Sequence, residues 1–585
     1  MIRLSPLLTL LAISLPCTLW TWLPRYISGV EGFNLPSERL QSSNGLVLRL
    51  LANKRNSSIR RTSTSTITST STIDKERKVV LFKLNCAASN EHENKLASSN
   101  NGDGERRIVV NVKQRKEIIK AGTLNLVKTM AGTGILALPM GVAKSSDFRS
   151  GIFPAILLMS VLGCVSAYTF GLYGRLIHAS QAKTLTELWE KTVDKKTAWF
   201  ISAATLIFCL GCGLSYSLCL GDVSSSLAQT IGWEGIWVSR RFWIVVLTTT
   251  VLYPLCNLKS LVALAPLSLA GVMAVLITTV FIAWRCPLVN PRSPYSTIIP
   301  GGGSLLMTLS PQQFPKFGTT SKGLLNPSSL VLFGMAAFAY LGHFVAPDLY
   351  HSFVSADNDD GNNLVSSTAD TSTDDGVGNS HQNHADTDTG SDNAILNSFF
   401  RVSLGGFVLT TIINCLIMAF GFLTFGGNSM GLVLNNFSTL DRGATVCRFF
   451  TTISVLGGYP FLIRACRREI LGLLKLFSNR DPKPSDEPVT TTLLLVSLTV
   501  ASMFLSDAGL IIGLAGAVMG SALAYIIPSI LFLSATNNKN KNSTINMEQK
   551  SRPRSMLLER LFCRFLVGFG TFAAFASIVS ILGGV

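Results

Sequence analysis

Apolar residues in this chain are gathered in long, nearly uninterrupted blocks, and this feature constrains its fold most strongly. A helix rises 1.5 Å per residue, so about twenty apolar residues cross the hydrocarbon core of a bilayer. Only helices and closed barrels span a membrane, because hydrocarbon offers backbone groups no hydrogen-bond partner. We therefore predict an all-α integral membrane protein with about eleven transmembrane helices, at residues 121–143, 152–177, 197–221, 242–258, 260–284, 328–350, 401–425, 443–463, 489–506, 508–533 and 561–583.

The composition agrees with a membrane protein. Of the 585 residues, 48% are hydrophobic and 14% are charged, whereas a soluble domain carries roughly 25% charged residues. The formal charge of +17 raises the possibility of a nucleic-acid partner. The Lys and Arg residues lie in an N-terminal tail and in loops between apolar blocks, where membrane topology places them. We expect the lipid bilayer as the surroundings, no nucleic-acid partner and no obligatory protein partner.

The distribution of positive charge predicts the orientation of the spans. Loops on the side of the N-terminal tail hold 25 Lys and Arg residues, and the opposite loops hold nine. Cytoplasmic loops carry an excess of Lys and Arg, so this bias places the tail on the cytoplasm-like side.

The N-terminal region has the composition of a targeting sequence. Residues 1–32 resemble a signal peptide, with Arg3 before an apolar stretch. Residues 33–115 form a Ser/Thr-rich and basic low-complexity tail that begins at Phe33. The pair resembles the bipartite plastid presequence of diatoms and related algae, which predicts the plastid envelope. An ordinary signal sequence before a disordered tail is the alternative, and it predicts an endomembrane or vacuole.

One loop departs from the rest of the transmembrane domain, residues 116–583. Residues 355–393 hold nine Asp residues, no Lys or Arg, and many Ser, Thr, Asn and Gly residues. Such a segment buries too little apolar surface to fold, so we predict a disordered acidic insert. His381 and His384 lie beside these carboxylates, but a solvated linker explains them better than a metal site.

Two spans carry residues that interrupt a helix. The first span contains GTGILALP, with Gly132, Gly134 and Pro139, and the sixth contains Gly342, His343 and Pro347. Glycine costs about 1 kcal/mol in a helix interior, and proline removes a hydrogen bond outright. Close helix crossings also use glycine, which is the alternative explanation. Interrupted spans at positions one and six divide ten spans as five plus five, the pattern of an inverted-repeat secondary transporter.

The membrane portion resembles the amino acid/auxin permease family. The stretches NLVKTMAGTGILALP, FAYLGHFVAPDLY and GGYPFLIRACRREI carry the resemblance, which covers about residues 121–583. It implies a LeuT-like 5+5 inverted repeat, eleven helices and cation-coupled transport of amino acids. The acidic insert and the long presequence depart from the family pattern, which puts location and regulation in doubt.

An interrupted helix offers partners to both charged groups of an amino acid. Free N–H groups begin one half-helix and free C=O groups end the other, so they suit a carboxylate and an ammonium group. We predict that the substrate is an amino acid held at the two interruptions. The predicted substrate-binding residues are Gly132, Thr133, Gly134, Tyr340, Gly342 and His343.

The coupling ion is either H⁺ or Na⁺. The resemblance implies a sodium site between spans one and eight, where Thr451, Thr452 and Ser454 offer hydroxyl groups. Such hydroxyl groups commonly bond their own helix instead. Lys128 is an ionisable residue within an interrupted span and is a proton-coupling candidate by default.

No pattern indicates an enzyme. The chain lacks the G-x-x-x-x-G-K-[ST] phosphate loop, so we expect no ATP-driven pumping, no catalytic residues, no metal site and no cofactor. Two other functions remain open: an ion channel, and a transceptor or membrane scaffold that signals through its loops. Saturable substrate flux distinguishes a transporter from both.

Overall fold

The computed structural model describes residues 102–258, 265–297, 303–318, 329–355, 384–478, 483, 485–505, 507–537 and 553–582. The predicted signal segment, most of the predicted tail and residues 356–383 of the acidic insert lie outside these ranges. The spans belong to one compact unit, which includes residues from Glu117 onwards.

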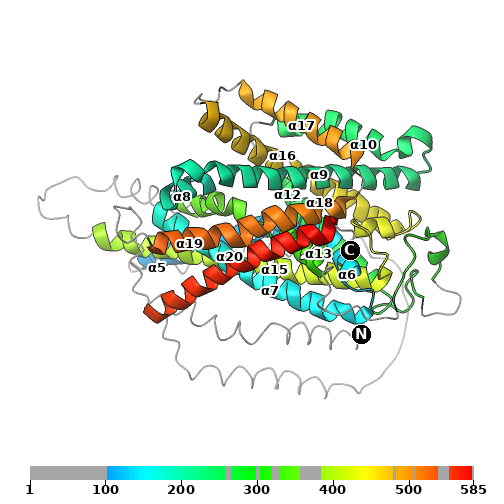
Figure 1. Cartoon of the computed structure of the whole chain (residues 1–585), viewed down its shortest axis with the longest axis horizontal. Coiled ribbons are helices and arrows are strands. Elements are labelled where there is room, and N and C mark those ends of the chain that lie inside the picture. Colours follow the sequence, from blue (N-terminus) through cyan, green and yellow to red (C-terminus); the bar gives the residue numbers. More distant parts are fainter. Residues whose placement is uncertain are drawn as a thin grey trace, which may run out of the picture. The chain divides into compact units, whose positions relative to one another are not determined.

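Eleven helical segments of the described chain correspond to the eleven predicted spans (Figure 1), and we number the spans accordingly. Span 1 consists of α5 (Gly102–Met130) and α6 (Gly134–Ser145), span 2 is α7 (Ile152–Ser180), and span 3 is α9 (Trp199–Thr230). Span 4 consists of α10 (Arg240–Leu247), η5 (Thr248–Leu252) and α11 (Tyr253–Cys256). Span 5 is α12 (Ala265–Arg285). Span 6 consists of α13 (Ser329–Ala339), η8 (His343–Val345) and the helical residues 346–355. Span 7 is α15 (His384–Phe425), span 8 is α16 (Arg442–Ser478), and span 9 is α17 (Asp486–Phe504). Span 10 joins α18 (Ala508–Ala515), η11 (Gly516–Gly520), η12 (Ala522–Ile526) and α19 (Ile527–Asn537), and span 11 is α20 (Pro553–Leu582).

Length and hydropathy agree with this assignment. Within the described ranges, eight helices are long and apolar enough to cross a membrane, and the bent pair of span 1 makes nine. Span 5 contains a shorter apolar helix, and the helical segments of span 4 lie at the predicted position. The prediction of an all-α membrane domain with interruptions in spans 1 and 6 is confirmed. One difference concerns the acidic insert, since α15 begins at His384, within the segment that we predicted to be disordered.

The spans form two groups that each pack mainly within themselves. Spans 1, 2, 6 and 7 contact one another through α6, α7, α13 and α15. In the second group, α9 of span 3 and α12 of span 5 both pack against α16 of span 8, and the long helices α9 and α16 make the most extensive contact (Figure 1). Span 10 packs against spans 3 and 6.

Small residues bring span 10 close to span 6. A Cβ built on Gly516 would overlap the carbonyl oxygen of Gly334, so a larger residue has no room there. Apolar burial gives little drive for helix association in a membrane, and close contact between small residues provides van der Waals packing instead. This packing fixes α13, and with it the interruption of span 6.

A buried ion pair closes the loops that follow spans 5 and 7. The Asp441 carboxylate, which is fully buried, accepts from Arg285 at 2.6 Å and from the Tyr295 hydroxyl at 3.1 Å. Burial and the neighbouring Asp441 carboxylate raise the pKa of Tyr295, so this phenol keeps its proton and donates it. Arg448 is buried as well, and its guanidinium donates to the carbonyl oxygens of Leu434, Phe437 and Ser438.

Candidate functional site

Span 1 is broken between α5 and α6. The two helices meet at an angle of 50°, and residues 131–133 connect them. Gly132 N–H donates to the carbonyl of Met130 at 2.9 Å, which is a tight turn and not a helical bond. The N–H groups of Thr133, Gly134 and Ile135 make no backbone hydrogen bond within the described part of the chain. The break therefore leaves donors and acceptors available to a ligand, as predicted for this stretch.

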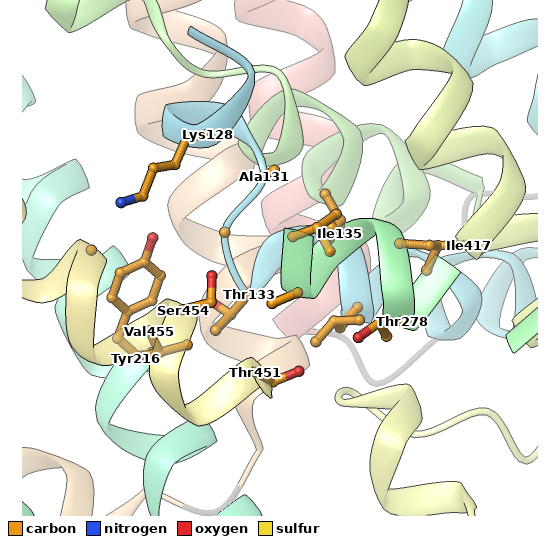
Figure 2. A pocket seen from close by; sticks show the side chains of 15 residues that line it. Lys128, Ala131, Thr133, Ile135, Tyr216, Thr278, Ile417, Thr451, Ser454 and Val455 are labelled. Atoms are coloured by element: carbon orange, nitrogen blue, oxygen red, sulfur yellow. The ribbon is translucent and has the colours of Figure 1, made fainter. Parts of the chain in front are cut away.

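A cavity lies against this break, between the two groups of spans (Figure 2). The cavity has a volume of ≈ 40 Å³, below the roughly 300–1,000 Å³ that small-molecule sites occupy, so it would have to widen to hold an amino acid. Spans 1, 3, 5, 7 and 8 supply its walls. The lining residues are Lys128, Ala131, Gly132, Thr133, Ile135, Leu136, Tyr216, Ala274, Val275, Thr278, Ile417, Thr451, Ser454, Val455 and Gly458.

The connecting residues of span 1 contact span 3 directly. The hydroxyl groups of Thr133 and Ser215 lie 2.6 Å apart and are buried. A Cβ built on Gly132 would lie 2.8 Å from the Tyr216 hydroxyl oxygen, so glycine is needed there to accommodate this tyrosine. Gly132 and Thr133 both line the cavity, and their role in substrate binding stays a prediction.

Gly134 has a different environment. It does not line the cavity, and a Cβ at this position would meet the Phe338 ring of α13 at 2.5 Å. Its small size therefore allows spans 1 and 6 to approach. This contact favours the alternative explanation of the motif, close helix packing, for Gly134.

The predicted residues of span 6 do not line the cavity. The Tyr340 hydroxyl bonds the carbonyl of Met159 at 3.0 Å and the Thr411 hydroxyl at 3.0 Å. These partners belong to spans 2 and 7, and neither they nor Tyr340 line the cavity. The alternative that we considered for Tyr340, a packing aromatic residue, agrees with this position.

His343 and Gly342 also pack inside the first group of spans. His343 is fully buried, and its Nε2 lies 3.0 Å from the Thr169 hydroxyl and 3.1 Å from the carbonyl of Ser166. A Cβ on Gly342 would contact Leu126 and Met130 of α5 at 3.1 and 3.2 Å. Neither residue lines the cavity, so a direct role in substrate binding stays a prediction for both.

Three of the four coupling-ion candidates line the cavity, unlike the predicted residues of span 6. Lys128, Thr451 and Ser454 all line the cavity, although they come from spans 1 and 8. Thr452 does not, because its hydroxyl donates to the carbonyl of Arg448 at 3.0 Å. Figure 2 shows Lys128 at one end of the cavity and Thr278 and Ile417 at the other.

Sequence reasoning missed several lining residues. Thr278 and Val275 come from span 5 and Ile417 from span 7, in spans without an interruption. Tyr216 is not among them: as a polar aromatic residue in the middle of span 3, it could be expected to close the pocket, with packing as the favoured alternative. Among the described residues, no cluster of three or more His, Cys, Asp or Glu could hold a metal ion.

The chain is similar in sequence to amino acid transporters. The family profile described as "Transmembrane amino acid transporter protein" matches residues 115–365 and 391–579. Vacuolar amino acid transporter 2 of Saccharomyces cerevisiae is 21% identical over 445 residues, 74% of this chain and 79% of that protein. Putative sodium-coupled neutral amino acid transporter 11 of Mus musculus is 21% identical over 432 residues, 72% of this chain and 79% of that protein.

A solved structure with a similar course is the crystal structure of MhsT in complex with L-phenylalanine. It superposes with a TM-score of 0.45 at 12% identity, over 79% of this chain and 98% of that chain.

Proposed function

The chain belongs to the transmembrane amino acid transporter family, and from this premise we propose that it is a secondary active transporter of neutral amino acids. Transport is by alternating access and is coupled to H⁺ or Na⁺. The observation that carries this proposal is the break of span 1, which lies in a cavity between the two groups of spans.

The break provides groups for both charges of a free amino acid. The N–H groups of Thr133, Gly134 and Ile135 stand at the N-terminus of α6, where the helix dipole favours a carboxylate. Carbonyl oxygens of Ala131 and Gly132, beside the C-terminal end of α5, suit the ammonium group. Gly132 and Thr133 keep their predicted roles as substrate-binding residues through these backbone groups.

The remaining walls favour a neutral side chain. Ile135, Leu136, Val275, Ile417 and Val455 give the cavity an apolar lining. None of its fifteen lining residues is acidic, so a cationic side chain would be buried there without a counter-charge. A small or branched aliphatic side chain fits this lining better.

The position of the cavity supports alternating access. Its walls come from span 1 and span 7 of one group and from spans 3, 5 and 8 of the other. Relative movement of the two groups would widen the cavity on one side of the membrane at a time. Tyr340 and His343 hold the interruption of span 6 onto spans 2 and 7, so this group would move as one body.

Saturable flux of a labelled amino acid tests the proposal. The full chain is purified and reconstituted into liposomes, and uptake of labelled L-alanine and L-valine is measured with and without gradients of pH and sodium. A transporter shows saturable uptake that a gradient accelerates. An ion channel conducts without saturation, and a transceptor or scaffold moves nothing, so either result rejects the proposal.

The membrane in which the protein works is a separate question. The yeast relative is named as a vacuolar transporter, which supports an endomembrane or vacuole for this chain. The plastid envelope remains a prediction from residues 1–115. A C-terminal fluorescent fusion in the source cells distinguishes the two locations.

A further inference from the structure

The side chain of Lys128 lies where three spans meet. Lys128 precedes the break of span 1 by about one helical turn, and its side chain reaches towards spans 5 and 8. The ammonium nitrogen is 5.4 Å from the centre of the Phe461 ring of span 8. A Cβ built on Gly271 of span 5 would lie 3.4 Å from Lys128 Cε and 3.0 Å from the Ser454 hydroxyl oxygen. The stem of Lys128 and the Ser454 hydroxyl thus lie against the same point of span 5.

The surroundings have the chemistry of an alkali-cation site. Thr451 and Ser454 of span 8 line the cavity and carry hydroxyl groups, and the break of span 1 adds carbonyl oxygens. Neutral oxygen ligands of this kind bind hard monovalent and divalent cations. The cavity already contains one positive charge, and Lys128 is the sole charged residue among its fifteen lining residues.

A second cation at this place would be repelled. Two unit charges repel each other more strongly in the interior of a protein than in water, so a cation beside the ammonium group would bind more weakly. No lining residue carries a negative charge that would offset the repulsion. The Phe461 ring contributes a further attraction for the ammonium group through its π-face.

We propose that the Lys128 ammonium group is itself the resident cation between spans 1, 5 and 8, and that this protein binds no sodium there. The inference rests on the proposed transport function. It removes sodium at this place from the two candidate coupling ions and leaves H⁺. It also separates this chain from the mouse relative, whose name describes it as sodium-coupled. Thr451 and Ser454 then serve as polar neighbours of Lys128 and not as sodium ligands.

Thermal unfolding in detergent tests the proposal without any need for transport. The purified full chain is heated in sodium chloride and in choline chloride at equal concentration. We expect equal melting temperatures for the wild type within about 1 °C. Lys128→Ala removes the ammonium group and leaves the oxygen ligands, so sodium should now raise the melting temperature by roughly 2–4 °C.

Three further variants test whether the loss of the Lys128 charge causes the sensitivity to sodium. Lys128→Arg keeps the charge and should stay insensitive to sodium. Lys128→Ala combined with Ser454→Ala should lose the gained sensitivity. Lys144→Ala removes a charge from the exposed end of the same span, outside the cavity, and should behave as the wild type. If Lys128→Ala accumulates poorly, Lys128→Ser is the second variant for the same comparison.

Uptake of labelled L-alanine into liposomes gives the second readout. Replacing sodium by choline should change the wild-type rate less than two-fold, whereas Lys128→Ala should depend on sodium. A wild type that sodium stabilises or accelerates overturns the proposal, and so does a folded Lys128→Ala that ignores sodium. If no variant moves alanine, the transport function fails, and the melting comparison still tests sodium binding by itself.

Discussion

The hydroxyl groups of Thr133 and Ser215 lie 2.6 Å apart in the interior of the protein. Thr133 belongs to the break of span 1, and Ser215 belongs to span 3 of the opposite group. This hydrogen bond crosses the boundary between the two groups of spans. In the alternating access that we propose, this boundary would shear, and the hydrogen bond would connect the break to that movement.

Thr133→Val removes this hydroxyl group with little change in volume. It leaves Ser215 without this partner at a buried position, which costs about 1–3 kcal/mol. We expect lower thermal stability and slower L-alanine uptake. Ser215→Ala should have a similar effect, and the double variant should cost less than the sum of the two. Additive losses would show that the two hydroxyl groups act independently.

Gly132→Ala tests the contact between the break and Tyr216. The new Cβ would lie 2.8 Å from the Tyr216 hydroxyl oxygen, closer than van der Waals contact allows. We expect a loss of uptake of at least ten-fold. Tyr216→Phe removes the obstructing oxygen, and the remaining ring atoms would lie 3.3 and 3.5 Å away, so the double variant should recover part of the activity.

A control for the added methyl group is Gly472→Ala in α16, where no atom lies within 4 Å of the new Cβ. This variant should transport normally. An inactive double variant Gly132→Ala, Tyr216→Phe would mean that Gly132 acts through its backbone conformation and not through the space it leaves.

Gly134→Leu should fail through packing. Its side chain would meet the Phe338 ring, whose nearest atom is 2.5 Å from the Cβ position. Overpacking of this kind costs typically about 1–3 kcal/mol, so we expect a lower melting temperature together with low uptake. Phe338→Ala in the same chain should restore part of the melting temperature. A stable Gly134→Leu without uptake would instead place Gly134 among the residues that contact the substrate.

Ile417→Ala should change substrate preference. Ile417 lies at the end of the cavity opposite Lys128, as Figure 2 shows, so its truncation lengthens the apolar end. A methylene group in such a pocket changes selectivity by roughly 10- to 200-fold. We expect the ratio of L-leucine to L-alanine uptake to rise about ten-fold. An unchanged ratio would mean that the substrate side chain points elsewhere.

Asp441→Ala should destabilise the loops after spans 5 and 7. Removing one partner leaves the charge of Arg285 without its counter-ion at 2.6 Å, which costs about 3 kcal/mol for a buried pair. Arg285 is partly exposed, so we expect a loss somewhat below that figure. The melting temperature measures it. The double variant Asp441→Ala, Arg285→Ala removes the unpaired charge as well. If it lowers the melting temperature as much as Asp441→Ala alone, the loss comes from the other donors to this carboxylate, the Tyr295 hydroxyl and the Gly443 N–H.

The sequence by itself determined the spans and their breaks, because both are local properties. Apolar blocks of sufficient length must become helices in hydrocarbon, where the backbone has no other partner. Glycine and proline weaken such a helix wherever they stand, so the GTGILALP stretch marked the break of span 1 before any contact was known. Lys128, which is close to this break in sequence, was predicted for the same reason.

Only the tertiary structure decided which residues face the cavity. A helix that is apolar on all sides has no hydrophobic stripe to show how it is rotated, since lipid and protein surroundings are equally apolar. Tyr340 was therefore predicted to face the cavity, and the packing of α13 against Gly516 and span 2 turns it towards Met159 and Thr411. Thr278 and Ile417 lie on helices without an interruption, and they reach the cavity because of how these helices are rotated about their axes. Side-chain packing with the neighbouring helices sets that rotation.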